Sequence, residues 1–285
     1  MNSKTLHLDD RVASYRSFLD YDWVKAVEKV THGTVIDEPF MSLIFSWKAT
    51  ANAFTMPFLM MHFLKNFEVG YCRSQETASE KAVKVLAEHL PERMAQKHGL
   101  SHMKKKQLAE TIAEMLTQAD LAKQTMPTLD VDELFHQFLF GNGGSEMQLG
   151  VFGLAQTCYG TTFHAYEHFV SRCVGLAKGK PNYKADGAQT LVADARKEFG
   201  DEVAEFCLVD EQVEIARLAR NALAHNGGKM NEKLKAKDHG FFVVDGVLHV
   251  VAADNHRLFN MLKVRVSKLV DKALTLPQFQ RSPGT

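Results

Sequence analysis

The 285-residue sequence predicts a mainly α-helical protein. Apolar residues recur at spacings of three and four through most of the chain, which is the pattern of helices that bury one face. In one short stretch near the C-terminal end this pattern gives way to β-rich runs, where a hairpin is expected. We see no internal repeat. The predicted fold is a helical N-terminal region followed by a helical bundle that carries one inserted β-hairpin, at about 239–253.

Residues 1–140 make up the predicted N-terminal region. Its most apolar stretch, 39–64, contains lysine, asparagine, proline and histidine side chains, so it lacks the uninterrupted apolar run of a membrane span. We therefore expect a pair of buried helices here, parted near Pro57. Three further helices are expected, over 76–90, 105–123 and 131–140. Pro91 should block continuation of the first of these.

The run GNGGS at 141–145 predicts a boundary between two regions. After it, 146–176 is expected to form one long helix, or two that join near Gly160. A polar loop should follow at 178–187. Further helices are expected over 188–199, 202–224 and 255–274. Between the last two, Asp245-Gly246 is a dipeptide that favours a two-residue turn, and it defines the predicted hairpin.

Charge and cysteine content restrict the function classes. Lys plus Arg and Asp plus Glu both number 34, so no overall field attracts nucleic acid or an anionic membrane. A nucleic-acid function would need a local basic patch. The four cysteines form no Cys-x-x-Cys pair, and the N-terminus lacks the apolar segment of a secretory signal. These features favour a cytoplasmic protein with reduced thiols and no membrane partner.

Residues 217–228, RLARNALAHNGG, combine a helix end with an unusual set of polar groups. The glycines can supply the left-handed residue that ends many helices, and a histidine in the last turn interacts favourably with the helix dipole. A plain helix end is thus one interpretation. At 100° per residue, however, five polar side chains fall on or beside one line of the helix. They are Glu214, Arg217, Arg220, Asn221 and His225. Alanines separate them, which would let another surface approach closely.

The stretch Arg220-Asn221-Ala222-Leu223-Ala224-His225 resembles the Arg-x(4–6)-His signature of HEPN domains, the helical family of higher eukaryote and prokaryote nucleotide-binding domains. The matching variant has a polar residue, often Asn, directly after the arginine. The resemblance covers roughly 148–274 and implies a HEPN-like domain at 146–275. Residues 1–140 show no such resemblance, so the role of that region stays open.

The resemblance implies a metal-independent endoribonuclease of toxin or antiviral-defence type, without a cofactor. In such enzymes the 2′-hydroxyl attacks the neighbouring phosphate and leaves a 2′,3′-cyclic phosphate end. By position, His225 would carry the proton transfer, since an imidazole has an ordinary pKa of about 6.5 and suits acid–base work near neutrality. Arg220 would hold the phosphate through its planar pair of donors. Asn221 would position His225 or a phosphate oxygen.

The partners that the resemblance implies are RNA and a second copy of the chain. HEPN domains usually dimerise with two motifs that face each other across a shared cleft. An antitoxin or regulatory protein is a further expected partner. An alternative within the family is a catalytically inactive HEPN dimer that binds a nucleotide or a protein.

Residues around the motif provide candidate support. Lys229, Lys233, Lys235 and Lys237 follow it closely, and they form either a solvated loop or a phosphate-contact patch. HEPN folds often place an acidic residue of an earlier helix against the motif arginine, and Glu167 is the candidate here. Glu214 and Arg217 complete the supporting set.

A competing motif is His164-Ala-Tyr-Glu167-His168, which has the H-x-x-E-H pattern of inverted zincins. On a helix, His164 and His168 could share one zinc ion, with Glu167 beside them as a base. Glu202 or Glu205 would have to supply a third ligand. A zinc-dependent hydrolase is therefore the minor alternative.

Overall fold

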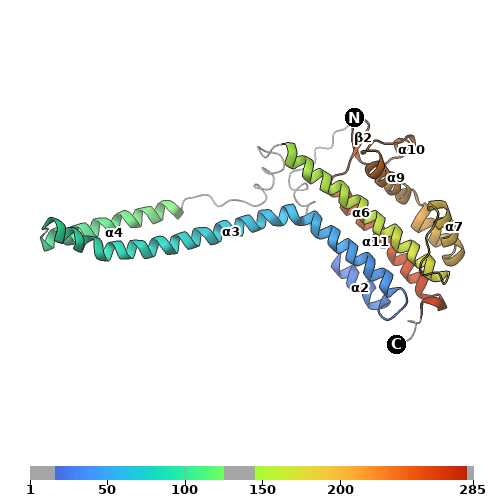
Figure 1. Ribbon diagram of the computed structural model, residues 1–285, viewed down its shortest axis with the longest axis horizontal. Coiled ribbons are helices and arrows are strands. Elements are labelled where there is room, and N and C mark those ends of the chain that lie inside the picture. Colours follow the sequence, from blue (N-terminus) through green and yellow to red (C-terminus); the bar gives the residue numbers. More distant parts are fainter. Residues whose placement is uncertain (1–16, 100, 125–144, 281–285) are drawn as a thin grey trace. The chain divides into compact units, whose positions relative to one another are not determined.

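The computed structural model describes residues 17–99, 101–124 and 145–280, and it is mainly α-helical, as the sequence predicts (Figure 1). The chain divides into two compact units. The described residues of 1–58 and 138–285 form the first unit, and those of 59–137 form the second. The motif at 220–225 lies in the first unit, which is therefore the one that carries the candidate site.

The centre of the first unit is formed by α6 (Ser145–Ala177) and α11 (Ala252–Leu274), which lie side by side (Figure 1). Two N-terminal helices pack against this pair: α2 (Tyr21–Thr31) and the first part of α3 (Asp37–His98). The buried indole of Trp47 donates to the Thr162 carbonyl at 3.0 Å and packs against the Phe259 ring, with 5.2 Å between centroids. Aromatic side chains of α2 and α3 thus supply part of the core.

This packing changes the division that the sequence suggests. We expected a boundary at 141–145, with all of 1–140 apart from the C-terminal bundle. The structure instead groups the described residues up to Phe58 with that bundle. The reason is that aromatic side chains of α2 and α3 are buried against α6 and α11.

The prediction of two helices parted near Pro57 is wrong, as is the prediction of a stop at Pro91. Helix α3 runs for 62 residues and passes through both prolines. A proline removes one backbone hydrogen bond and crowds the preceding turn, which usually ends or bends a helix. Here alanine, leucine, methionine and glutamate dominate the flanking turns, and their high helix propensity favours continuation.

In the second unit, the remainder of α3 is joined by α4 (His102–Gln124), which confirms the helix expected over 105–123. Lys105 of α4 donates to a carboxylate oxygen of Glu92 in α3 at 3.0 Å. The helix expected over 131–140 lies outside the described residues, and so does most of GNGGS. No helix in the described part of the chain combines the length and apolarity that a membrane span needs.

The segments that lead to the motif match the prediction in part. Helix α6 is one unbroken helix, and α7 (Ala188–Phe199) follows the polar loop as expected. The single helix predicted over 202–224 is instead three elements: α8 (Asp201–Ala204), the π-helical turn η1 (Glu205–Val209) and α9 (Glu211–His225).

The break falls at Asp210, whose side chain accepts from the Gln212 N–H and caps α9. The buried Arg265 of α11 holds this break. Its guanidinium donates to the Phe206 and Met261 carbonyls and pairs with the Asp210 carboxylate. Because α9 begins at this cap, Arg265 fixes where the motif helix starts.

The predicted hairpin is confirmed, but it is shorter than 239–253. Strand β1 (Phe242–Val244) pairs antiparallel with β2 (Val247–His249). Asp245 and Gly246 both have positive φ, 49° and 76°, as a type I′ turn requires. The short helix α10 (Glu232–Lys235) precedes the hairpin, and the turn η2 (Pro277–Phe279) follows α11.

Candidate active site

The C-terminal end of α9, where His225 lies, is fixed by the hairpin. The N–H groups of Asn226 and Gly228 both donate to the Ala222 carbonyl and close the helix. Gly228 has a φ of 83°, and a Cβ at this position would lie 3.0 Å from the Val247 side chain. The Leu248 N–H donates to the Gly228 carbonyl at 2.8 Å. Glycine at 228 thus permits the close approach of β2 that anchors the motif helix.

Arg220 is held by three polar side chains. Its Nη1 donates to Asn221 Oδ1 at 2.8 Å, and its Nη2 lies 3.2 Å from His164 Nδ1. The same Nη2 lies 3.8 Å from Glu167 Oε2. Since these partners come from both α6 and α9, the guanidinium sits between the two helices.

Glu167 also pairs with Arg217, whose Nε donates to Glu167 Oε1 at 3.0 Å. Arg217 Nη2 donates to the Leu208 carbonyl at 3.0 Å. One carboxylate on α6 therefore faces two arginines on α9, and the structure brings Glu167 to the place that the sequence argument proposed for it. This pairing compensates the charge of closely spaced cations before any anion binds.

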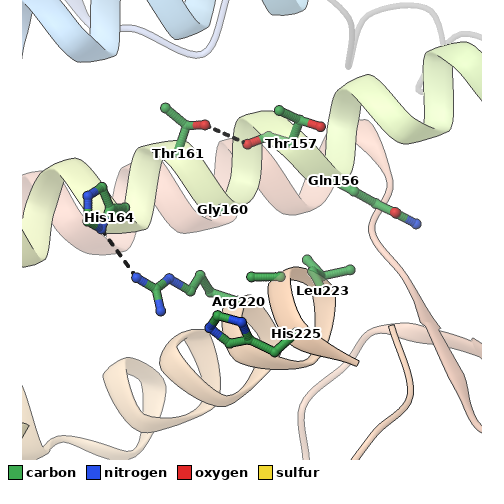
Figure 2. Close-up of a pocket in the computed structure, with 9 residues that line it drawn as sticks. Gln156, Thr157, Gly160, Thr161, His164, Arg220, Leu223 and His225 are labelled. Carbon is green, nitrogen blue, oxygen red and sulfur yellow. Dashed lines mark hydrogen bonds between the residues drawn. The ribbon is translucent and has the colours of Figure 1, made fainter. Parts of the chain in front are cut away.

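A cavity of about 430 Å³ lies between α6 and α9. Helix α9 contributes the side chains of Arg220, Leu223 and His225 to its lining, and Figure 2 shows them across the cavity from α6. Helix α6 contributes His164 and a row of small or polar residues. That row comprises Gln156, Thr157, Gly160 and Thr161. The arginine and histidine of the motif thus border one cavity within a single chain.

Asn221 and Glu214 both contact charged side chains. The Asn221 amide oxygen accepts from Arg220, so this side chain positions the arginine and not His225. Glu214 lies one turn or more away from the cavity lining and pairs with Lys237, at 2.8 Å between Oε2 and Nζ. This hydrogen bond raises the pKa of the Lys237 ammonium above its ordinary value.

The four lysines after the motif do not form one continuous free patch. Lys237 bonds to Glu214 and lies 3.4 Å from Glu211, while Lys235 lies 2.7 Å from a Glu232 oxygen. Lys229 and Lys233 are exposed, and no carboxylate in the described part of the chain lies within ion-pair distance of either. Only these two are available to meet a phosphate without losing an existing partner.

The arrangement does not provide the zinc site of the alternative motif. Glu167 is occupied by the two arginines, and His164 faces Arg220. The proposed third ligands, Glu202 and Glu205, pair with Lys268 and Arg196. Among the described residues, no group of three or more His, Cys, Asp or Glu side chains could hold a metal ion.

His168, the other histidine of that motif, is exposed. Partial burial lowers the pKa of its imidazole, and the nearby Arg172 charge lowers it further. His168 does not border the cavity. Cys158, Cys173 and Cys207 are unpaired and buried, and burial raises the pKa of each thiol.

The α6 wall of the cavity was missed by sequence reasoning, although a signal for it exists. Gln156, Thr157, Gly160, Thr161 and His164 recur at spacings of three and four. They form a polar, small-residue face on a helix whose other positions are largely apolar and buried. No family model, no curated protein and no solved structure matches the chain. Function must therefore be argued from this geometry and from the motif.

Proposed function

We propose that the chain is a metal-independent endoribonuclease of HEPN type that acts on RNA in the cytoplasm, in defence or as a toxin. The observation that supports this best is the placement of Arg220 and His225 on one cavity. Its volume of about 430 Å³ lies within the range of small-molecule pockets, roughly 300–1,000 Å³. Proteins that recognise RNA by sequence mostly bind unpaired nucleotides, and we propose single-stranded RNA as the substrate.

The proposed reaction needs one nucleophile that the RNA itself supplies. The ribose 2′-oxygen attacks the adjacent phosphorus, the bond from phosphorus to the 5′-oxygen breaks, and a 2′,3′-cyclic phosphate and a 5′-hydroxyl remain. His225 is exposed at the end of α9 and accessible to a substrate, so it would carry the proton that moves from the 2′-oxygen to the 5′-oxygen. Arg220 would bind the non-bridging oxygens as their negative charge grows.

Dimerisation and regulation are part of this proposal. Two copies with their α9 ends facing each other would place two Arg220–His225 pairs on one cleft. An antitoxin or another regulatory protein would then limit RNA cleavage by covering that cleft.

One observation favours the alternative of a catalytically inactive dimer that binds a nucleotide or a protein. Arg220 already has Asn221, His164 and Glu167 as partners, so a phosphate must compete with them for the guanidinium. Such competition would harm a site that only binds an anion less than a site in which Arg220 must also stabilise a transition state.

Incubation of the purified protein with total RNA in EDTA tests the proposal. Cleavage should occur, and the new ends should be 2′,3′-cyclic phosphate and 5′-hydroxyl. The Arg220→Ala, His225→Ala double variant should leave the RNA intact. His32→Ala is a matched control, because His32 is highly exposed in the turn between α2 and α3. If the wild-type protein and the double variant leave RNA equally intact, the nuclease proposal fails and the binding alternative stands.

A further inference from the structure

His164 is the residue of the cavity to which the proposed mechanism gives no role. It lies on α6, opposite the motif helix, and borders the same cavity as Arg220 and His225 (Figure 2). Its Nδ1 lies 3.2 Å from Nη2 of Arg220. His164 thus contacts Arg220, the residue that would bind the phosphate, from the α6 side of the cavity.

The contact with Arg220 determines which nitrogen of His164 carries the proton. A guanidinium has donors only, so Nδ1 must accept in this contact. An imidazole whose Nδ1 accepts is neutral and carries its proton on Nε2. Among the described residues, no hydrogen-bond partner for Nε2 is found. The ring therefore retains one donor for a ligand in the cavity.

The two threonine hydroxyls on the α6 wall are less suited to donate. The hydroxyls of Thr157 and Thr161 already donate to the carbonyls of Gly153 and Thr157. Nor does Arg220 depend on His164 for its orientation, because Asn221 and Glu167 already hold it. A bound phosphate oxygen beside Arg220 would meet Nε2–H as a further neutral donor.

We propose that His164 binds the substrate: its Nε2–H donates to a non-bridging phosphate oxygen that Arg220 also contacts. The inference rests on the proposed function for the identity of the phosphate ester. One chain then supplies two imidazoles with different roles, since His225 transfers a proton and His164 keeps its own. His164 takes no part in proton transfer, because its free lone pair is occupied by Arg220.

The first test reads the tautomer directly. In protein labelled with ¹⁵N at histidine, the side-chain spectrum of His164 should show a protonated Nε2 and an unprotonated Nδ1. Free neutral histidine also favours Nε2–H, so the Arg220→Ala variant should show a larger share of the Nδ1-protonated tautomer than the wild-type protein. A protonated Nδ1 in the wild-type protein would overturn the inference. This measurement needs no RNA, so it stands whether or not the protein proves to be a nuclease.

The second test compares two isosteric variants. Glutamine can place a donor near the position of Nε2 but offers nothing at Nδ1, whereas asparagine can offer an acceptor near Nδ1 and nothing at Nε2. The probe is a 2′-deoxy dinucleotide, which has the phosphodiester but no attacking hydroxyl. Binding should weaken about tenfold or more in His164→Asn, since a hydrogen bond to a charged group is lost, and should change little in His164→Gln.

The opposite result would overturn the inference. If His164→Asn binds as the wild type does and His164→Gln does not, the histidine only holds Arg220. Equal binding by all three proteins would leave it without a role. If RNA is cleaved, a pH–rate profile that loses one of its limbs in both variants would assign proton transfer to His164 and exclude a fixed donor. His32→Gln is the control for histidine replacement at an exposed position.

Discussion

At the residue scale, Arg220 is the group whose surroundings are most specific. Its Nη1 meets an amide oxygen from its own helix, and its Nη2 meets an imidazole and a carboxylate from α6. A planar guanidinium can satisfy these partners and still present an edge to a phosphate, because its five donors point in fixed directions. A lysine ammonium at the same position would carry the same charge without that geometry.

Arg220→Lys should therefore lose most of the activity although the charge is kept. We expect a fall in kcat of about 100-fold, the size associated with loss of one preorganised donor to a developing negative charge. Single-turnover cleavage of a labelled RNA measures it. Arg217→Lys is the matched control, because Arg217 meets Glu167 but does not border the cavity. An equal loss in both variants would mean that the two arginines act through the ion-pair network alone.

Gly175 illustrates a residue whose importance lies in packing. A Cβ there would lie 2.6 Å from Tyr183 Cβ and 2.8 Å from the Lys180 carbonyl oxygen, so the loop after α6 rests directly on the helix backbone. Gly153, on the same helix, has nothing within 4 Å of the corresponding position.

Gly175→Ala should lower the free energy of unfolding by about 1–3 kcal/mol, because the loop must move away. Gly153→Ala should instead raise it by up to about 1 kcal/mol, since alanine has the higher helix propensity and meets no obstacle. Urea denaturation followed by circular dichroism compares the two. If the Gly175→Ala protein is as stable as the wild type, the loop after α6 can move away without a loss of folding free energy.

At the element scale, the start of α9 depends on α11. At the end of the π-helical turn η1, some carbonyls lack a partner within the helix. The buried Arg265 donates to the Phe206 carbonyl and also pairs with the Asp210 carboxylate. The guanidinium also lies over the Phe206 ring, 4.8 Å from its centroid. The last helix of the unit thereby aligns the helix that carries the motif.

Arg265→Leu should destabilise the fold by about 1–3 kcal/mol, because it leaves backbone carbonyls and the partly exposed Asp210 carboxylate without their donor. Activity should fall with it, since α9 loses the support of its first turn. Thermal unfolding and RNA cleavage would be measured together. Lys268→Leu provides the comparison: Lys268 is on α11 too, but its pair with Glu202 is exposed, so its loss should change the stability much less than the loss of Arg265.

The elements that the sequence predicted well are those determined by local pattern. The helices α4, α7 and α11 and the turn at Asp245-Gly246 follow from periodicity and turn chemistry. The course of α3 through two prolines could not be inferred, because it depends on the balance between one lost hydrogen bond and the propensity of many neighbours. The break at Asp210 had a signal, an aspartate before glutamate, but its partner Arg265 lies 55 positions away.

In the candidate site, too, some residues could be predicted from local sequence and others depend on tertiary packing. Arg220 and His225 follow from their spacing on one helix, and Glu167 from helix order. The cavity also needs His164 and Gly160 from α6, and only tertiary packing brings these residues opposite α9.

At the scale of the whole molecule, the equal numbers of acidic and basic residues would limit the binding of the proposed RNA substrate. Near the motif, three described cations could contact phosphates under this proposal: Arg220 in the cavity, and Lys229 and Lys233 on the surface. The other lysines near the motif are paired with carboxylates. Electrostatic attraction should thus be local and modest.

RNA binding should accordingly show a shallow salt dependence. With three phosphate contacts, the slope of log K against log salt should be about −2 for a single strand, so affinity should fall about 20-fold between roughly 50 and 200 mM salt. Fluorescence anisotropy with the His225→Ala variant measures it. Lys229→Gln should flatten the slope and Lys237→Gln should not. A slope of about −3.5, the value for five phosphate contacts, would show that the paired Lys235 and Lys237 also release their carboxylates to bind RNA.

Assembly is the second property at this scale. His225 and Ala224 are exposed at the end of α9, and small residues around them would allow a second copy to approach. We expect a closed symmetric dimer, the simplest arrangement that places two motifs together. Light scattering at tens of micromolar should give twice the chain mass of 32.0 kDa. A monomeric mass would contradict the shared-cleft arrangement. Any activity would then have to come from the cavity of a single chain.

The contact between α2 and α11 has a consequence for how the protein is made. Trp23 Nε1 donates to Ser267 Oγ, and Lys263 pairs with Asp20, across more than 240 positions of the chain. Translation proceeds at about 5–20 residues per second, so α2 leaves the ribosome on the order of 10–50 s before its partner exists. The first unit cannot close during that interval. A nascent chain therefore remains without a finished candidate site while it is still attached to the RNA that encodes it.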